Sequence, residues 1–369
     1  MNKGGITMKY SKQYSEITGK LLGRAFAEGQ DANLLFSPFS LLALLGMLME
    51  CVDGETREEI RQAVGGDFSY NNLKKTLTRL QKDFVSGDAL VSSNVLCVRE
   101  DLKATLRPGF EKKLDGYDGR IISSKNMVDD INKWAEKNTK GMVSQIADES
   151  MKDMVVGLLN AVAFEDKWEE PYEDHDVWKE EFHNSDGTKS SIDMLHRMED
   201  IYVEDQCFTG FVKPYASGDY SYMALLPRKR GKMYMDYSLE RLDLNSLYKK
   251  AIRHKVHTTM PEFTYDSEKE LTDFCKDLGI TTAFSDYADF SPLSSVPLKV
   301  DSIKQKAHIE VDRQGTKAAA VSFAAICLGC ALDFENPPKE VRLDRPFLYA
   351  IVHHKTGLPV FVGMVNKVG

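Results

Sequence analysis

The sequence predicts a single α+β domain that spans residues 1–369 and is built around a large sheet. Segments with the apolar spacing of helices and short apolar runs typical of strands are mixed along the chain. No repeat, linker or low-complexity tract interrupts it. With 42% hydrophobic and 28% charged residues, the composition is that of a globular protein with a buried core. One α+β domain accounts for all three observations.

Helices are predicted where apolar residues recur every three or four positions. The segment 41–52 is very apolar, and the turn residues 53–56 separate it from a second helix at 57–64. Gly141 follows the segment 129–140, where a glycine suits a helix C-terminus. The predicted helices are residues 10–28, 41–52, 57–64, 70–85, 108–114, 129–140 and 268–278.

Strands are predicted from short runs of apolar residues bounded by turn residues. Residues 154–164 are almost wholly apolar, which suits a strand buried on both faces, and Asn160 within it must find hydrogen-bond partners. Residues 348–352 and 359–365 form a predicted hairpin around Thr356 and Gly357. A further short strand is predicted within residues 33–40, ended by Ser37 and Pro38. Other strands or extended segments are predicted at residues 89–98, within 191–227, 260–265 and 296–311.

Composition and charge narrow the possible partners and compartments. A formal net charge of −8 argues against a nucleic-acid partner, whose binding requires neutralised phosphates. The first residues contain no apolar core typical of a signal peptide, and no apolar run is long enough to cross a membrane. We therefore expect a protein with no membrane partner that stays inside its cell, or an extracellular protein whose leader has been removed.

The basic cluster at residues 228–232, reading RKRGK, allows two interpretations. The simpler one is a hairpin turn with solvated charges, and the alternative is a site for an anionic polysaccharide.

Motifs for catalysis and metal binding are absent from the sequence. It contains no G-x-S-x-G, no H-E-x-x-H and no glycine-rich phosphate loop. His353 and His354 are adjacent, and neighbours on a strand point to opposite faces, so joint metal ligation is not expected. Four of the six cysteines, at positions 51, 97, 207 and 275, are expected to be free packing residues. We predict no catalytic residue, no metal and no cofactor.

The segment 309–338 is the most unusual stretch of the chain. Residues 309–312 alternate apolar and acidic as a half-buried strand does, and Gly315 offers a place to turn. The alanine-rich run that follows could form a buried core helix. With a period of two, however, Thr316 and every second residue after it present a face of small, uncharged side chains. Such a segment could insert between the strands of a sheet without desolvating a charge.

Several motifs resemble those of the serpins, the serine-protease-inhibitor family, and they follow in the family's order over nearly the whole chain. Individually they are weak, but together at family spacing they are specific. They are Asn33 with residues 37–40, residues 53–56, residues 131–134 with Thr139 and Gly141, residues 159–164 with Trp168 and Pro171, residues 260–263, 278–280, 289–291, 344–349 and 361–363.

This resemblance implies a serpin fold of three β-sheets with about nine helices and an exposed reactive-centre loop at about residues 313–340. It implies a metastable monomer whose partner is a target serine protease. The protease attacks the loop and forms an acyl-enzyme, and the cleaved loop then inserts into the main sheet and disables the protease. The alternative is a non-inhibitory member of the family that acts as a carrier, chaperone or storage protein.

The resemblance also assigns roles to individual residues. Small hinge residues are typical of inhibitory members, and here they are Gly315, Thr316, Lys317, Ala318, Ala319, Ala320, Val321 and Ser322. Ser37, Ser40 and Asn160 match shutter residues, which lie beneath the strands that part, and Trp168 matches the point where insertion begins.

Three positions depart from the family pattern. Arg313 and Lys317 replace common glutamates, from which we expect altered kinetics and not lost function. Gln305 replaces the usual shutter histidine, and its amide can form hydrogen bonds but cannot titrate.

The scissile bond implied by the spacing from the hinge is Gly329–Cys330. Because this loop is longer than usual, the bond could also involve Leu328, Ala331, Leu332 or Glu335. No lysine or arginine occurs from residue 318 to 338, so we expect an elastase-, subtilisin- or chymotrypsin-like target. Cys327 and Cys330 are expected to be two thiols, and the alternative is a disulfide that closes a small ring and lowers inhibition.

Overall fold

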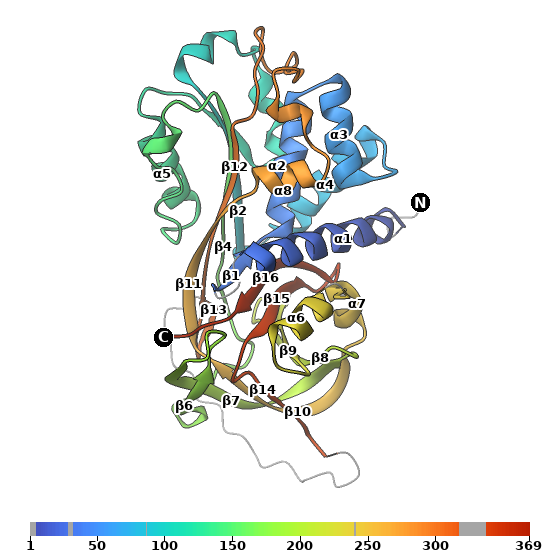
Figure 1. The fold of residues 1–369 in the computed structure, drawn as a ribbon, viewed down its shortest axis with the longest axis vertical. Coiled ribbons are helices and arrows are strands. Elements are labelled where there is room, and N and C mark those ends of the chain that lie inside the picture. The colour runs from blue at the N-terminus through green and yellow to red at the C-terminus, as the bar shows by residue number, and fades with distance from the viewer. Residues whose placement is uncertain (1–4, 29–31, 86, 240, 317–336) are drawn as a thin grey trace. The chain divides into compact units, whose positions relative to one another are not determined.

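The computed structural model describes residues 5–28, 32–85, 87–239, 241–316 and 337–369, and Figure 1 shows their helices and strands. The α-helices are α1 (Gly5–Glu28), α2 (Pro38–Cys51), α3 (Gly54–Gly65), α4 (Tyr70–Phe84), α5 (Met127–Asn138), α6 (Lys232–Leu239), α7 (Leu244–Lys249) and α8 (Thr272–Asp277). Six short 3₁₀ helices are also described: η1 (Glu100–Thr105), η2 (Phe110–Lys113), η3 (Asp115–Tyr117), η4 (Glu149–Met151), η5 (Asp174–Asp176) and η6 (Thr282–Phe284).

Sixteen strands complete the described part of the chain. They are β1 (Leu34–Phe36), β2 (Leu90–Val98), β3 (Gly119–Ile122), β4 (Val156–Phe164), β5 (Asp166–Lys167), β6 (Val177–His183), β7 (Lys189–Glu204), β8 (Phe208–Pro214), β9 (Tyr220–Pro227), β10 (Ile252–Pro261), β11 (Phe263–Glu270), β12 (Ser302–Val311), β13 (Gly315–Thr316), β14 (Lys339–Arg342), β15 (Phe347–His353) and β16 (Leu358–Val365). The α+β class is confirmed.

Three predicted elements differ from the structure. Residues 268–270 belong to strand β11 and not to a helix, because their pairing with β12 overrides the helix propensity of Glu and Lys. The predicted helix at 108–114 is the 3₁₀ turn η2. Residues 228–231 do not form a hairpin turn, because they connect strand β9 to helix α6.

The described residues group into two compact units. Unit 1 comprises residues up to 24, 35–164 and 266–308, and unit 2 comprises residues 25–34, 165–265 and 309–369. Each unit gathers separate segments of the chain. That residues 1–369 form a single domain stays a prediction.

Unit 1 contains the strand order β3-β2-β4-β12, with β11 on the other side of β12. Strand β4 pairs in antiparallel with β2 and in parallel with β12. Helix α5 covers one face of these strands and α2 lies on the opposite face (Figure 1). Leu159 and Ala161 of β4 pack in the core beneath α5. Side chains alternate along a strand, so Asn160 points to the α2 side.

Unit 2 contains the strand order β16-β15-β9-β8-β7-β10-β14, with β6 paired to β7. Strand β7 is sixteen residues long and pairs with three partners along its length. Its first part pairs with β6, its middle with β10, and residues 202–204 with β8. Through β7, the strands β6, β8 and β10 belong to one hydrogen-bonded sheet.

Candidate functional site

The first part of the candidate site is strand β13 in unit 2, where the predicted hinge begins. Thr316 pairs in antiparallel with Val311 of β12, and it also pairs in antiparallel with Asp166 of β5. The turn before β13 is made by Asp312, whose Oδ1 accepts hydrogen bonds from the backbone N–H of Gln314 at 2.7 Å and of Gly315 at 3.0 Å. Strand β13 thus lies between β12 and β5.

Gly315 has a different role from the predicted one. It is absent from the glycines with positive φ, so the turn does not require its freedom. A Cβ atom at Gly315 would lie 2.2 Å from the carbonyl oxygen of Asp166 and 2.7 Å from the Cα of Lys167. Glycine is required here because β13 and β5 approach each other too closely for any side chain.

An aromatic cluster surrounds the start of the hinge. Trp168 is buried and stacks on Tyr215, with ring centroids 4.7 Å apart. The Trp168 indole N–H donates to the carbonyl of Asp312 at 2.9 Å, and its backbone N–H donates to the carbonyl of Gln314 at the same distance. The hydroxyl of Tyr215 lies 2.6 Å from that of Thr316, which is fully buried. The predicted positions Trp168 and Thr316 are therefore brought together.

A buried ion pair lies beside this cluster. Lys213 Nζ lies 2.6 Å from Glu199 Oε1, and both side chains are buried. Burial lowers the pKa of Lys213 although Glu199 favours its charged form. The ammonium also lies over the rings of Tyr172 and Trp168, at 4.6 Å and 5.6 Å from their centroids. Lys213 and Tyr215 were not predicted from the sequence. The signal for Lys213 is a single charge in an otherwise apolar strand.

Arg313 lies in the turn between β12 and β13, and its side chain is 36% exposed. It pairs with Glu262 at 3.3 Å and with Asp174 at 3.1 Å. The positive charge at this position is thus compensated by two carboxylates.

The second part of the candidate site lies in unit 1, on the α2 side of strands β2, β4 and β12. Gln305 of β12 holds the backbone of Ser37 with both ends of its amide. Its Oε1 accepts from the Ser37 N–H at 2.7 Å and its Nε2 donates to the Ser37 carbonyl at 3.1 Å. The Ser37 hydroxyl accepts from the Ser40 N–H at the start of helix α2.

The chain of polar contacts continues from Ser40 to Asn160. The hydroxyls of Ser40 and Ser92 lie 2.9 Å apart. The Asn160 amide nitrogen lies within hydrogen-bond distance of Ser92 Oγ at 3.2 Å, the Ser93 carbonyl at 3.1 Å and Asn94 Oδ1 at 3.0 Å. Asn160 Oδ1 is buried and has no partner in the described structure. The four predicted residues Ser37, Ser40, Asn160 and Gln305 therefore form one buried cluster.

The β2 residues of this cluster were not predicted from the sequence. Ser92, Ser93 and Asn94 are three consecutive polar residues in the middle of a buried strand, and that run is the signal that could have found them.

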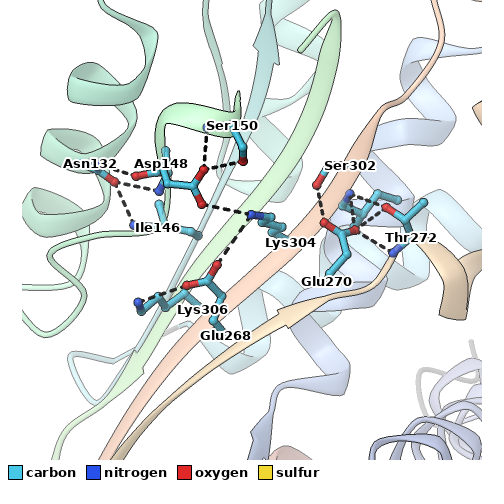
Figure 2. Close-up of polar contacts among 12 residues, drawn as sticks. Asn132, Ile146, Asp148, Ser150, Glu268, Glu270, Thr272, Ser302, Lys304 and Lys306 are labelled. Atoms are coloured by element: carbon cyan, nitrogen blue, oxygen red, sulfur yellow. Dashed lines mark hydrogen bonds and ion pairs between the residues drawn. The ribbon is translucent and has the colours of Figure 1, made fainter. Parts of the chain in front are cut away.

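On the opposite face of β12, lysines reach carboxylates on both sides of the strand (Figure 2). Lys304 Nζ lies 3.7 Å from Glu268 of β11 and 3.8 Å from Asp148 in the loop before β4. Hydrogen bonds from Ser150, and more weakly the charge of Lys304, lower the pKa of Asp148. The amide oxygen of Asn132 on α5 anchors this loop by accepting from the backbone N–H groups of residues 146 and 147, both at 2.9 Å.

Many of the predicted site residues lie outside the described residues. They are the remaining hinge positions Lys317, Ala318, Ala319, Ala320, Val321 and Ser322, the predicted reactive-bond positions Leu328, Gly329, Cys330, Ala331, Leu332 and Glu335, and Cys327. The four cysteines that the structure does describe are free and buried, as predicted.

Among the residues that the structure describes, no group of three or more His, Cys, Asp or Glu side chains is placed to hold a metal ion. Every helix in the described ranges is too short or too polar to cross a bilayer.

The sequence model of the family described as "Serpin (serine protease inhibitor)" matches residues 12–368. The chain belongs to the serpin family. It is 27% identical to plasminogen activator inhibitor 1 of Neovison vison, over 94% of this chain and 90% of that protein. The family's description and the name of this relative both denote inhibitors and not enzymes.

Solved serpin structures share this fold. The native state of the thermophilic serpin tengpin has a TM-score of 0.86 and 29% identity, covering 98% of this chain and 94% of tengpin. Human thyroxine-binding globulin in complex with its hormone has the same TM-score at 23% identity, covering 98% of this chain and 99% of that one. The serpin fold is therefore shared by proteins whose names denote different functions, so the fold alone does not decide between an inhibitor and a carrier.

Proposed function

We propose that this serpin is a suicide-substrate inhibitor of serine proteases that traps the acyl-enzyme by inserting its cleaved loop between strands β4 and β12. The observation that carries the proposal is strand β13. Its two residues already lie antiparallel between β12 and β5, and β5 continues β4 after a single residue. Continued in the same direction, the chain after Thr316 would separate β12 from β4 and pair with both.

The energetic argument follows from the hydrogen-bond ladders. Strands β4 and β12 pair directly from Gly157 and Ser302 to Ala163 and His308. A strand inserted between them replaces one ladder with two. Each inserted residue then adds about one net backbone hydrogen bond, worth about 1 kcal/mol. The side chains at alternate positions after Thr316 are small and uncharged. Burying them on insertion therefore costs less desolvation free energy than burying large or charged side chains would.

The polar cluster of unit 1 supports the same mechanism. Gln305 and Asn160 face each other across the β4–β12 pairing, and both bind polar partners on the α2 side. Hydrogen bonds can re-form after a strand has moved, whereas interlocked apolar side chains must be repacked. We propose Ser37, Ser40, Asn160 and Gln305 as shutter residues, Trp168 as the residue at the insertion point, and residues 315–322 as the hinge.

The target proposed from the loop sequence is an elastase-, subtilisin- or chymotrypsin-like serine protease, with Gly329–Cys330 as the proposed reactive bond. The catalytic chemistry belongs to that protease. This serpin supplies a substrate segment and the free energy of strand insertion, and we propose no catalytic residue in it.

The experiment is to incubate the protein with pancreatic elastase and with subtilisin and to separate the products on a denaturing gel. The proposal predicts a covalent complex with at least one of them, larger than either protein. Protease inactivated beforehand at its active-site serine is the control and gives no complex. Cleavage of the loop without any complex would instead favour the carrier or storage function.

A further inference from the structure

A pocket of about 250 Å³ lies in unit 2, and none of the residues that line it belongs to the proposed inhibitory mechanism. Phe26 and Met235 contribute buried apolar side chains, 5% and 6% exposed, and Pro227 and Pro346 also line it. A concave, mostly apolar surface with a few charged groups is typical of small-molecule sites.

The charged residues of this pocket all have the same sign. Lys229, Arg230, Lys232 and Arg345 line it, and no aspartate or glutamate does. Such a concentration is unusual in a chain whose net charge is −8. In the part of the chain that the structure describes, Lys229, Arg230 and Lys232 form no ion pair. Arg228 of the same basic cluster differs, because it pairs with Glu204.

Arg345 is the cation with a partly buried side chain, 18% exposed. Its guanidinium donates to the Pro227 carbonyl at 2.9 Å and lies 3.4 Å from Asp344. Burial, together with the charge of Arg230, lowers the pKa of Arg345. A guanidinium has five N–H donors, and these two contacts leave capacity for a further acceptor.

We propose that this pocket binds a small amphipathic anion, with its apolar body against Phe26 and Met235 and its acidic head group among Arg230, Lys232 and Arg345. An anion there would reduce the repulsion among the cations and form charge-assisted hydrogen bonds. The apolar wall would bury a hydrocarbon or aromatic body that a simple inorganic anion lacks. The pocket volume suits a short-chain fatty acid or an aromatic carboxylate better than a long lipid.

The test uses the full chain, with decanoate as the probe, isothermal titration calorimetry for affinity, and methyl-¹³C methionine NMR for location. Substitution Met235→Leu assigns the Met235 methyl signal. The proposal predicts binding of one decanoate per chain and a shift of that signal. Decyltrimethylammonium has the same body with the opposite charge, and inorganic phosphate has charge without a body, so both should bind about ten-fold more weakly or not at all.

Charge reversal provides the matched control. The exposed pair Arg230→Glu with Lys232→Glu should weaken decanoate binding about ten-fold or more, whereas Lys179→Glu with Lys103→Glu, exposed lysines outside the pocket, should leave it nearly unchanged. Equal affinity in the two double variants would overturn the proposal, as would equal binding of the cationic amphiphile. Binding of a sulfated oligosaccharide with no shift at Met235 would also contradict it and would favour a surface polysaccharide site.

Discussion

The start of the hinge in unit 2 and the β4–β12 pairing in unit 1 are held by different forces. Strand β13 is fixed between two strands by backbone ladders, by a glycine without room for a Cβ, and by the buried Thr316–Tyr215 contact. The β4–β12 pairing has a single ladder, and its α2 side is lined by the hydrogen-bonded side chains of Asn160 and Gln305. The first region is held by close packing of backbone and side chains. The second is held by side-chain hydrogen bonds that can break and form again with other partners.

This difference suggests that the two regions have different roles in loop insertion. A tightly packed start fixes the direction and register of the inserting strand, because a slip of one residue would turn its larger side chains inward. The pairing of β4 residues 157–163 with β12 residues 302–308 is called the seam below. Because polar side chains line it, its strands can separate and pair again without leaving an apolar cavity. Changes in the first region should therefore abolish insertion, whereas changes in the second should alter its rate and the stability of the uncleaved protein.

The largest effect is expected for Thr316→Arg. Thr316 is fully buried, and an arginine there would place a long charged side chain beside Tyr215 and Trp168. Desolvating the guanidinium there costs more than an ion pair with Asp166, the residue opposite Thr316 on β5, returns. We expect protease to cleave the loop but to be released, so the denaturing gel shows product and no complex. Thr316→Val, which keeps the shape, is the control and should still trap protease. Undiminished trapping by the arginine variant would contradict the account of the hinge.

A smaller effect is expected for Asn160→Ala. The change removes the two N–H donors of the Asn160 amide from a buried site, so the Ser93 carbonyl and Asn94 Oδ1 lose this hydrogen-bond partner. The unfolding free energy of the intact protein should fall by about 1–3 kcal/mol. Trapping capacity should also be lost faster on mild heating. Asn71→Ala, at an exposed position of helix α4, serves as the control and should change neither. An Asn160 variant as stable as the parent would mean that the polar cluster does not hold the seam.

Asp166 gives a pH dependence at the hinge. Burial raises the pKa of its carboxyl above the ordinary 3.8, and its Oδ2 has no partner in the described structure. The native state therefore holds this proton to higher pH than the unfolded state, so stability falls as pH rises from about 3.8 through the native pKa. Asp166→Asn should lack this loss and be more stable at neutral pH. Because the group is only half-buried, the gain should stay below about 1 kcal/mol. Parallel stability–pH curves for the two proteins would contradict this assignment.

The smallest effect is expected for the ion pair that crosses the seam. Asp148 lies in the loop that leads into β4, and Lys304 lies on β12. An inserted strand adds about 4.8 Å between β4 and β12, so we expect it to break this contact. Asp148→Asn should speed loop insertion two- to five-fold at low salt, by about 0.5–1 kcal/mol. Asp266→Asn is the control, because Asp266 pairs with His308 between β11 and β12 on one side of the seam. Equal acceleration by both changes would rule out a specific role for the crossing pair.

Much of the fold was predictable because helical spacing and apolar runs are local signals. The apolar segment at 41–52 became α2, and the strand at 154–164 became β4 with Asn160 buried, as predicted. Residues 268–270 were predicted wrongly because Glu and Lys favour helices in isolation, whereas pairing with β12 decides their structure. A tertiary contact cannot be inferred from a local pattern.

The candidate site was predictable only in part for the same reason. Ser37, Asn160 and Gln305 were identified through a family resemblance, and the structure shows which atoms join them. Tyr215 was missed because nothing in the sequence links it to Thr316, which follows it by 101 positions. Gly315 was predicted to make the turn, but its φ is not positive and the structure requires a glycine there because β5 lies close to it. That approach is visible only in three dimensions.

Thermal unfolding before and after a single cut in the loop tests strand insertion most directly. If the cleaved loop becomes a strand between β4 and β12, the cut protein gains one backbone ladder and should unfold at a markedly higher temperature than the intact one. Thr316→Arg, cut in the same way, should gain little. An unchanged unfolding temperature in the cut parent protein would show that the sheet does not accept the loop, and the proposed inhibitory mechanism would be wrong.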